Sequence, residues 1–185
     1  MERAAAQIGG KPRVVILIRG FNNSFGTFRA EYAATRAWLT EQGVGRVDGQ
    51  GGAQGTAYLD IYWDALHRGG GKVGYPFGRF VRARGHAERA GRFGLRDLLH
   101  RLPAGSDVTL LTHSLGVEVA LAALAERPSG RGELACGKRI ASALPDHLGD
   151  VRLVAFAPAV GRVQLLDPEG RVTQRTLGAI DRMYV

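Results

Sequence analysis

Short apolar runs alternate with helical patterns along this chain. Val14–Ile18 is a continuous β-branched run, which is typical of a strand buried on both faces. Four more strands are predicted from β-branched and aromatic residues: Tyr58–Trp63, Asp107–Thr112, Val151–Phe156 and a last one beginning at Arg182–Val185. Helices are predicted from about Phe25 to Gln42, from Arg79 or Arg84 to Arg101, from Leu115 to about Glu126, and near Gln174–Ile180. This alternation predicts an α/β fold with a mostly parallel sheet and helices on both faces.

Length and composition agree with one domain. The chain has 185 residues, of which 45% are hydrophobic and 23% charged, as in ordinary globular proteins. We expect a single domain over residues 13–185, with residues 1–12 as a loose N-terminal segment. The chain shows no signal-peptide pattern and its longest apolar run is too short to span a bilayer, so a cytoplasmic protein without membrane partners is expected. The single Cys136 cannot form an internal disulfide, and no metal or organic cofactor is expected.

The formal net charge of +8 raises the question of a nucleic-acid partner. A binding surface would need its basic residues on one face. The best candidates share one side of a predicted helix, and they are Arg82, Arg89, Arg92 and Arg96. A solvated helix face explains this spacing equally well. The arginine-rich composition also fits a codon bias, which argues against a nucleic-acid partner.

The strongest chemical signal is Thr112-His113-Ser114-Leu115-Gly116, between a predicted buried strand and a helix. A serine on such a tight turn projects its hydroxyl above the sheet edge, where the helix N-terminus favours a developing oxyanion. Ser114 is therefore a candidate nucleophile; alternatively, it only caps the helix.

A second motif, Arg19–Ser24, follows the first strand. Ligands of open α/β sheets bind at the carboxyl ends of the strands, so Gly20 and Phe21 are expected beside Ser114 with free N–H groups. The alternative is a plain turn in which Asn22 and Asn23 are turn formers.

With both motifs, the chain resembles the α/β-hydrolase superfamily over about residues 13–185. The resemblance is closest to uncharacterised bacterial hydrolases whose oxyanion loop reads His-Gly-Phe-Asn-Asn-Ser. It implies a three-layer sandwich, a Ser114 nucleophile, and oxyanion-hole N–H groups from Phe21 and Leu115, supported by Gly20, Asn22, His113 and Gly116. Tyr62-Trp63-Asp64 is similar to the family's aromatic strand end. Arg19 and Thr112 depart from the pattern, in which histidine and a small residue are usual.

The family's catalytic acid and histidine follow later strands, whereas this chain stops at Val185. The fold is therefore expected to be incomplete at its C-terminus. Asp64 and Asp167 are candidates for pocket residues or for the acid, with ordinary turn roles as the alternative. His67 is the one histidine expected at the correct sheet edge outside the elbow, and an ordinary surface-loop histidine is the favoured alternative for it. His100 and His147 are expected at the opposite edge.

Three functions follow from these patterns. The first is a serine hydrolase that acts on a carboxylic ester, thioester or amide. The second is a truncated, catalytically incompetent domain of the same fold. The third is a basic nucleic-acid-binding domain, supported only by net charge. The sequence names neither the acyl substrate nor the oligomeric state.

Overall fold

In the part of the chain that the structure describes, five parallel strands form one sheet in the order β2-β1-β3-β4-β5. The computed structural model describes Ile8 and residues 13–20, 25–44, 55–63, 76–125, 145–159 and 182–184. The strands are β1 (Arg13–Ile18), β2 (Thr56–Ile61), β3 (Asp107–His113), β4 (Val151–Phe156) and β5 (Arg182–Tyr184). The predicted α/β class with a parallel sheet is confirmed. The second strand begins two residues earlier than predicted, because Thr56 and Ala57 pair with Arg13 and Val14.

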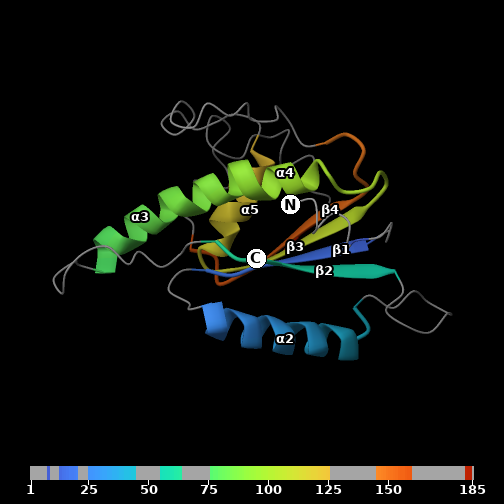
Figure 1. Cartoon of the computed structure of the whole chain (residues 1–185), viewed down its shortest axis with the longest axis horizontal. Helices are drawn as coiled ribbons and strands as arrows, with labels where there is room; N and C mark the ends of the chain where they lie inside the picture. Colours follow the sequence, from blue (N-terminus) through green and yellow to red (C-terminus); the bar gives the residue numbers. More distant parts are fainter. Residues whose placement is uncertain are drawn as a thin grey trace.

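Helices lie on both sides of this sheet (Figure 1). Helix α2 (Phe25–Glu41) lies on one face, while α3 (Pro76–Arg89), α4 (Arg96–Leu99) and α5 (Gly116–Leu124) lie on the other. A π-helical segment, η1 (Ala90–Leu95), joins α3 to α4. The step from β1 to β2 runs in the opposite direction to the later steps, so right-handed connections place α2 on the face opposite to the other described helices. The helix predicted near Gln174–Ile180 lies outside the described residues.

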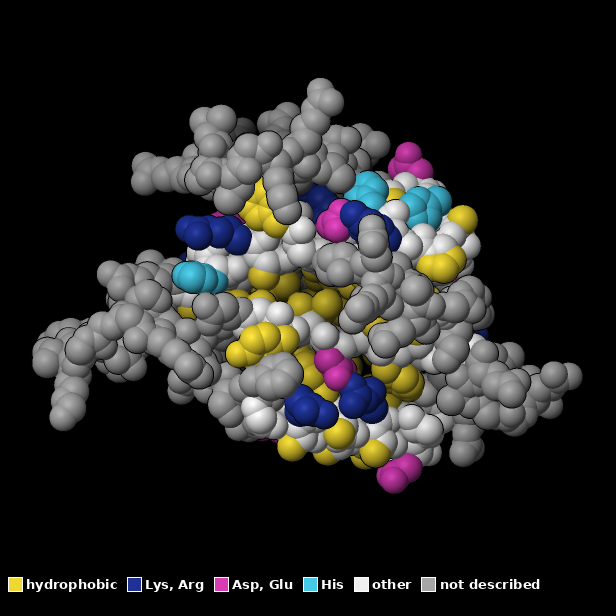
Figure 2. Space-filling model, in the orientation of Figure 1, with side chains coloured by type: hydrophobic (Ala, Val, Ile, Leu, Met, Phe, Trp, Pro, Cys, Tyr) yellow, Lys and Arg dark blue, Asp and Glu magenta, His cyan; other side chains and the backbone are white. Residues whose placement is uncertain are grey.

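The two faces of the sheet are covered unequally. The larger core lies under α5 and η1 and includes Ile16, Leu98, Leu110 and Leu121. Under α2 lies a smaller cluster, which consists of Val15, Leu17, Phe28, Tyr32 and Leu39. The alternate residues of β3 and β4, such as Leu111 and Val154, are only half-buried. In the space-filling view, hydrophobic side chains are visible in the middle of the molecular surface (Figure 2).

The helices on the larger face approach each other closely. A Cβ atom added to Gly91 would lie 2.2 Å from the backbone oxygen of Val119, so only glycine permits this contact between η1 and α5. Arg84 of α3 also pairs with the buried Glu118 of α5, at 3.8 Å.

No helix in the described part of the chain is long and apolar enough to cross a membrane.

The aligned arginines of this layer do not form one exposed basic face. Arg92 and Arg96 are buried, with exposed fractions of 5% and 3%, whereas Arg89 is exposed. Arg92 pairs with Glu88 at 3.0 Å, and Arg96 binds backbone oxygens at the end of α5. The predicted alignment on one solvated side is therefore not seen: the π-helical segment η1 interrupts the α-helical spacing, and Arg92 and Arg96 are buried while Arg89 is exposed. The side chain of Arg82 lies outside the described part.

Candidate functional site

Ser114 occupies a strained turn between β3 and α5. Its φ angle is 52°, in the left-handed region, which costs an L-residue about 1–2 kcal/mol. Backbone hydrogen bonds hold this conformation: the Ser114 N–H donates to the Phe156 oxygen at 2.9 Å. The backbone oxygen of Ser114 accepts hydrogen bonds from the N–H groups of Val117 and Ala159, at 3.3 and 3.2 Å. Strain of this kind persists only where the surroundings enforce it, and it concentrates at functional sites.

Two glycines bring the end of β1 against this turn. A Cβ on Gly116 would lie 2.3 Å from the backbone oxygen of Ile18. A Cβ on Gly20 would lie 2.7 Å from the Cβ of Ser114 and 3.0 Å from the nitrogen of Leu115. Real Cβ atoms do not make contacts under 3.0 Å, so both positions require glycine. The motifs around Gly20 and Ser114, far apart in the sequence, are therefore in direct contact.

The N-terminus of α5 lies at this contact. Leu115 is the residue before the helix, and the first N–H groups of a helix have no partner within it. The helix dipole adds a partial positive charge at the same place. The Leu115 N–H beside Gly20 is therefore suited to bind an oxyanion. Phe21 and Asn22, predicted to complete this part of the site, lie outside the described residues.

Both backbone polar groups of Arg19 are held by aromatic side chains. The Arg19 N–H donates to the Tyr32 hydroxyl oxygen at 2.8 Å, and the Trp63 indole N–H donates to the Arg19 oxygen at 2.7 Å. The Tyr32 hydroxyl in turn donates to the Ile61 oxygen at 3.1 Å. Because Gly20 follows Arg19 directly, these bonds position Gly20 against Ser114.

Burial keeps the Tyr32 hydroxyl of this network protonated. Desolvation is the main cause that raises the pKa of the Tyr32 hydroxyl above its ordinary value, so the hydroxyl keeps its donor proton at neutral pH. The Arg19 guanidinium forms an ion pair with Glu31 of α2. Arg19 thus contacts α2 twice, through its backbone N–H to Tyr32 and through its side chain to Glu31. The family that the chain resembles usually has histidine at this position.

Three of the four described histidines lie at the edges of the sheet, and the fourth, His86, lies in α3. His113 ends β3 next to Ser114, and its side chain is exposed. His147 lies at the other edge, where its Nε2 is 3.0 Å from the Leu102 oxygen. His100, which follows α4, also precedes the amino end of β3. His67, Asp64 and Asp167 lie outside the described residues, so their proposed roles stay predictions.

Sequence reasoning missed Tyr32 and Trp63 as parts of the site. Tyr32 was predicted only as one of the apolar residues of its helix, and Trp63 only as part of an aromatic strand end. Their hydrogen bonds to Arg19 span 13 and 44 residues of sequence, and no local pattern signals such a pairing. An aromatic residue with a polar tip on a buried face was the available hint, since such tips find a partner when buried.

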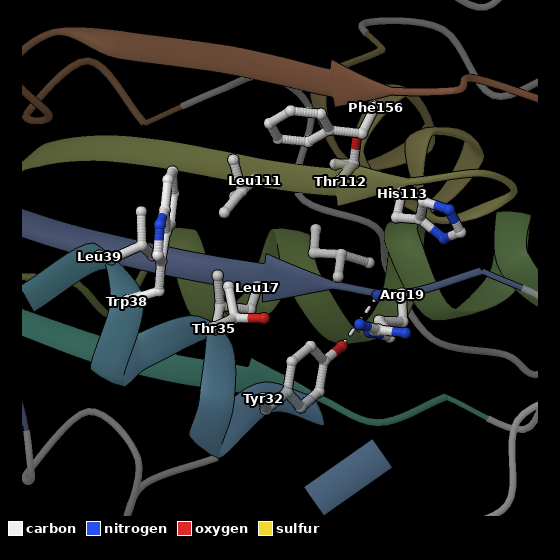
Figure 3. A pocket seen from close by; sticks show the side chains of 11 residues that line it. Leu17, Arg19, Tyr32, Thr35, Trp38, Leu39, Leu111, Thr112, His113 and Phe156 are labelled. Atoms are coloured by element: carbon white, nitrogen blue, oxygen red, sulfur yellow. Dashed lines mark hydrogen bonds between the residues drawn. The ribbon is translucent and has the colours of Figure 1, made fainter. Parts of the chain in front are cut away.

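A cavity of about 330 Å³ lies beside the elbow on the α2 face. Figure 3 shows its walls, with Tyr32 and Trp38 from α2, Leu17 from β1, and Leu111 and His113 from β3. Arg19, which also lines the cavity, lies just after the end of β1, and Phe156 of β4 closes one side. The residues that the structure describes include no cluster of His, Cys, Asp or Glu suited to a metal ion.

Comparison with known proteins adds no relative: no family model, curated protein sequence or solved structure matches the chain. The interpretation of the site therefore depends on its own geometry.

Proposed function

We propose that the protein is a serine hydrolase of the α/β-hydrolase type, acting on a carboxylic ester, thioester or amide. The observation that supports it most is the left-handed Ser114 between a central parallel strand and a helix N-terminus. A serine that only caps a helix has no need of left-handed strain, because capping residues normally adopt the β region. The helices on both sides of the sheet agree with the three-layer architecture of that superfamily (Figure 1).

In the proposed reaction, the Ser114 Oγ attacks the substrate carbonyl carbon while a base removes the Oγ proton. The new C–O bond converts the carbonyl oxygen into an oxyanion, to which the N–H groups of Leu115 and Phe21 donate. One such donor contributes about 3 kcal/mol of transition-state stabilisation. The oxyanion then collapses, the bond to the leaving group breaks, and the leaving group takes up the proton. Water releases the acyl group from Ser114 by the same steps.

The base is expected to be an imidazole, as in other serine hydrolases. His67, the histidine expected at this edge of the sheet, lies outside the described residues, so a role as the base stays a prediction. His113 is adjacent to the nucleophile but belongs to the strand end, from which its side chain lines the neighbouring cavity. The catalytic acid is likewise expected outside the described residues.

A fluorophosphonate probe tests the proposal, because it reacts only with an activated serine: the Oγ–P bond forms and fluoride leaves. The wild-type protein should be labelled, and Ser114→Ala should abolish labelling. Ser106→Ala is the matched control, since Ser106 precedes β3 at the other edge, where its hydroxyl donates to the Pro103 oxygen at 2.7 Å. That variant should be labelled like the wild type.

Circular dichroism must show that each variant is folded. A folded wild-type protein that is neither labelled nor able to hydrolyse simple esters would overturn the proposal in favour of a catalytically incompetent domain. Equal labelling of Ser114→Ala and the wild type would reject Ser114 as the nucleophile.

A further inference from the structure

The surface that the cavity beside the elbow exposes is almost entirely apolar. At the end near the carboxyl ends of β1 and β3 it is lined by Arg19, Tyr32 and His113, but the Tyr32 hydroxyl is bonded to the Arg19 N–H and the Ile61 oxygen, and the Arg19 guanidinium pairs with Glu31 (Figure 3). At the other end, the walls are Trp38 and Leu39 of α2, opposite Leu111 of β3. The part of a ligand that matches this lining is an apolar chain.

The end of the cavity lined by Arg19 and His113 adjoins the proposed nucleophile. Arg19 immediately precedes Gly20, which contacts Ser114, and His113 immediately precedes Ser114. Phe156 contacts both the elbow and the cavity: its backbone oxygen accepts a hydrogen bond from the Ser114 N–H, and Phe156 also lines the cavity. Ser114 does not itself line the cavity, so a chain attached to a carbonyl group at Ser114 would enter the cavity past the lining residues His113 and Phe156.

The cavity also exposes apolar surface that the described chain leaves uncovered. Trp38 is 57% exposed and Phe156 is 54% exposed, although both contribute to its walls. Its volume of about 330 Å³ falls at the lower end of the range of small-molecule sites. A medium-length acyl chain suits such a site better than a bulky or long one.

We infer that this cavity binds the apolar acyl chain of the substrate, so that the enzyme prefers esters or thioesters of medium-chain aliphatic acids. This inference depends on the proposed hydrolase function for the reaction, but the binding of the chain itself does not require catalysis. Each methylene group that enters the cavity should raise kcat/KM about threefold to fourfold, until the cavity is filled.

Binding is tested first without any reaction. Decanoate, kept below its micelle concentration, should change the fluorescence of Trp38 in a saturable titration, with equal affinity in the wild type and in Ser114→Ala. Trp38→Phe should lose this signal, because the other tryptophan, Trp63, is buried and bonded to Arg19. Acetate at the same concentrations should produce no change.

Filling the cavity tests its location. Thr35 lines the cavity from α2, and its hydroxyl only donates to the Glu31 oxygen one turn earlier. Thr35→Phe should weaken decanoate binding at least tenfold and lower kcat/KM for a decanoyl ester by a similar factor, while an acetyl ester changes less than twofold. Ala34→Phe adds the same ring to an exposed position of the same helix and should leave both values unchanged.

The outcomes separate the two proposals. Decanoate binding that Thr35→Phe blocks, in a protein without esterase activity, would support the chain-binding cavity and reject the hydrolase. Ester hydrolysis with no preference between acetyl and decanoyl chains, and no response of Trp38 to decanoate, would reject the cavity's role alone. A concentration-dependent dimer that shields Trp38 and excludes decanoate would also overturn the inference, in favour of a second copy of the chain at this face.

Discussion

Gly20, at the end of β1, lies directly against Ser114, at the end of β3: a methyl group on Gly20 would approach the Ser114 Cβ to 2.7 Å. The same methyl group would lie 3.0 Å from the His113 oxygen and 3.0 Å from the Leu115 nitrogen. These are backbone atoms of the elbow, which cannot move aside as a flexible side chain can. The contact between the two motifs thus depends on the absence of a side chain at Gly20.

Gly20→Ala should therefore disturb the elbow itself. We expect a loss of stability of about 1–3 kcal/mol from overpacking, together with at least a tenfold slower reaction with a fluorophosphonate. Urea unfolding and labelling rates measure the two effects. Gly85→Ala is the control, because a Cβ at this position of α3 meets nothing within 4 Å, and alanine should stabilise the helix by about 0.5–1 kcal/mol. Equal labelling rates in both variants would contradict the proposed role of the contact.

Arg96 provides a test of the core under α5. Its Nε donates to the Ala123 oxygen at 2.8 Å, its Nη2 donates to the Ala122 oxygen at 3.2 Å, and it also binds the Ala125 oxygen. These carbonyls are at the end of α5, where they lack helical partners and where a positive charge is favoured. Arg96→Met keeps much of the volume but removes these charged hydrogen bonds, so it should lower the unfolding free energy by about 2–4 kcal/mol.

Arg101→Met is the surface counterpart of that variant. Arg101 is exposed and pairs with Asp97 at 3.0 Å, an ion pair of the kind that contributes less than about 1 kcal/mol. Denaturant midpoints of the two variants should differ clearly. If both lose the same small amount, the carbonyls of α5 do not depend on Arg96.

Much of the sheet could be predicted because its strands have clear apolar patterns. Val14–Ile18 is uniformly apolar because it is buried on both faces, whereas Val151–Phe156, which coincides with β4, is fully buried only at alternate residues. The start of β2 was missed because Ala57 is less typical of strands than the aromatic Tyr58 that follows it. Periodicity also could not show that Arg92 and Arg96 pack inward, since it aligns residues on a side without saying what covers that side.

The candidate site was predictable where its residues are neighbours in sequence. The strand, turn and helix around Ser114 follow from local pattern, and the structure adds the left-handed φ. The clamp on Arg19 was not predictable, because Tyr32 and Trp63 reach it from other elements. The cavity was equally hidden, because it depends on how much of β3 and β4 the helix α2 leaves uncovered.

The hydroxyl of Tyr32 links the geometry of the site to alkaline stability. Tyr32→Phe removes the acceptor of the Arg19 N–H and the donor to the Ile61 oxygen, so it should cost about 1–3 kcal/mol at pH 8. It should also slow fluorophosphonate labelling, because Gly20 loses part of its support. The labelling rate and urea unfolding of the two proteins at pH 8 measure these effects.

The same substitution should change how stability depends on pH. Burial raises the pKa of Tyr32 in the folded protein, so above the unfolded pKa of about 10 the unfolded chain loses a proton that the folded protein keeps. The Tyr32 contribution is therefore complete below about pH 10 and decreases at higher pH, by up to about 1.4 kcal/mol per pH unit. Urea unfolding between pH 8 and 11 should show the stability difference between wild type and Tyr32→Phe shrinking. Trp63→Phe removes the other bond to Arg19 but no titrating group, so its difference from wild type should stay constant over this range. If the stability difference between wild type and Tyr32→Phe is equally independent of pH, burial does not raise the pKa of the Tyr32 hydroxyl.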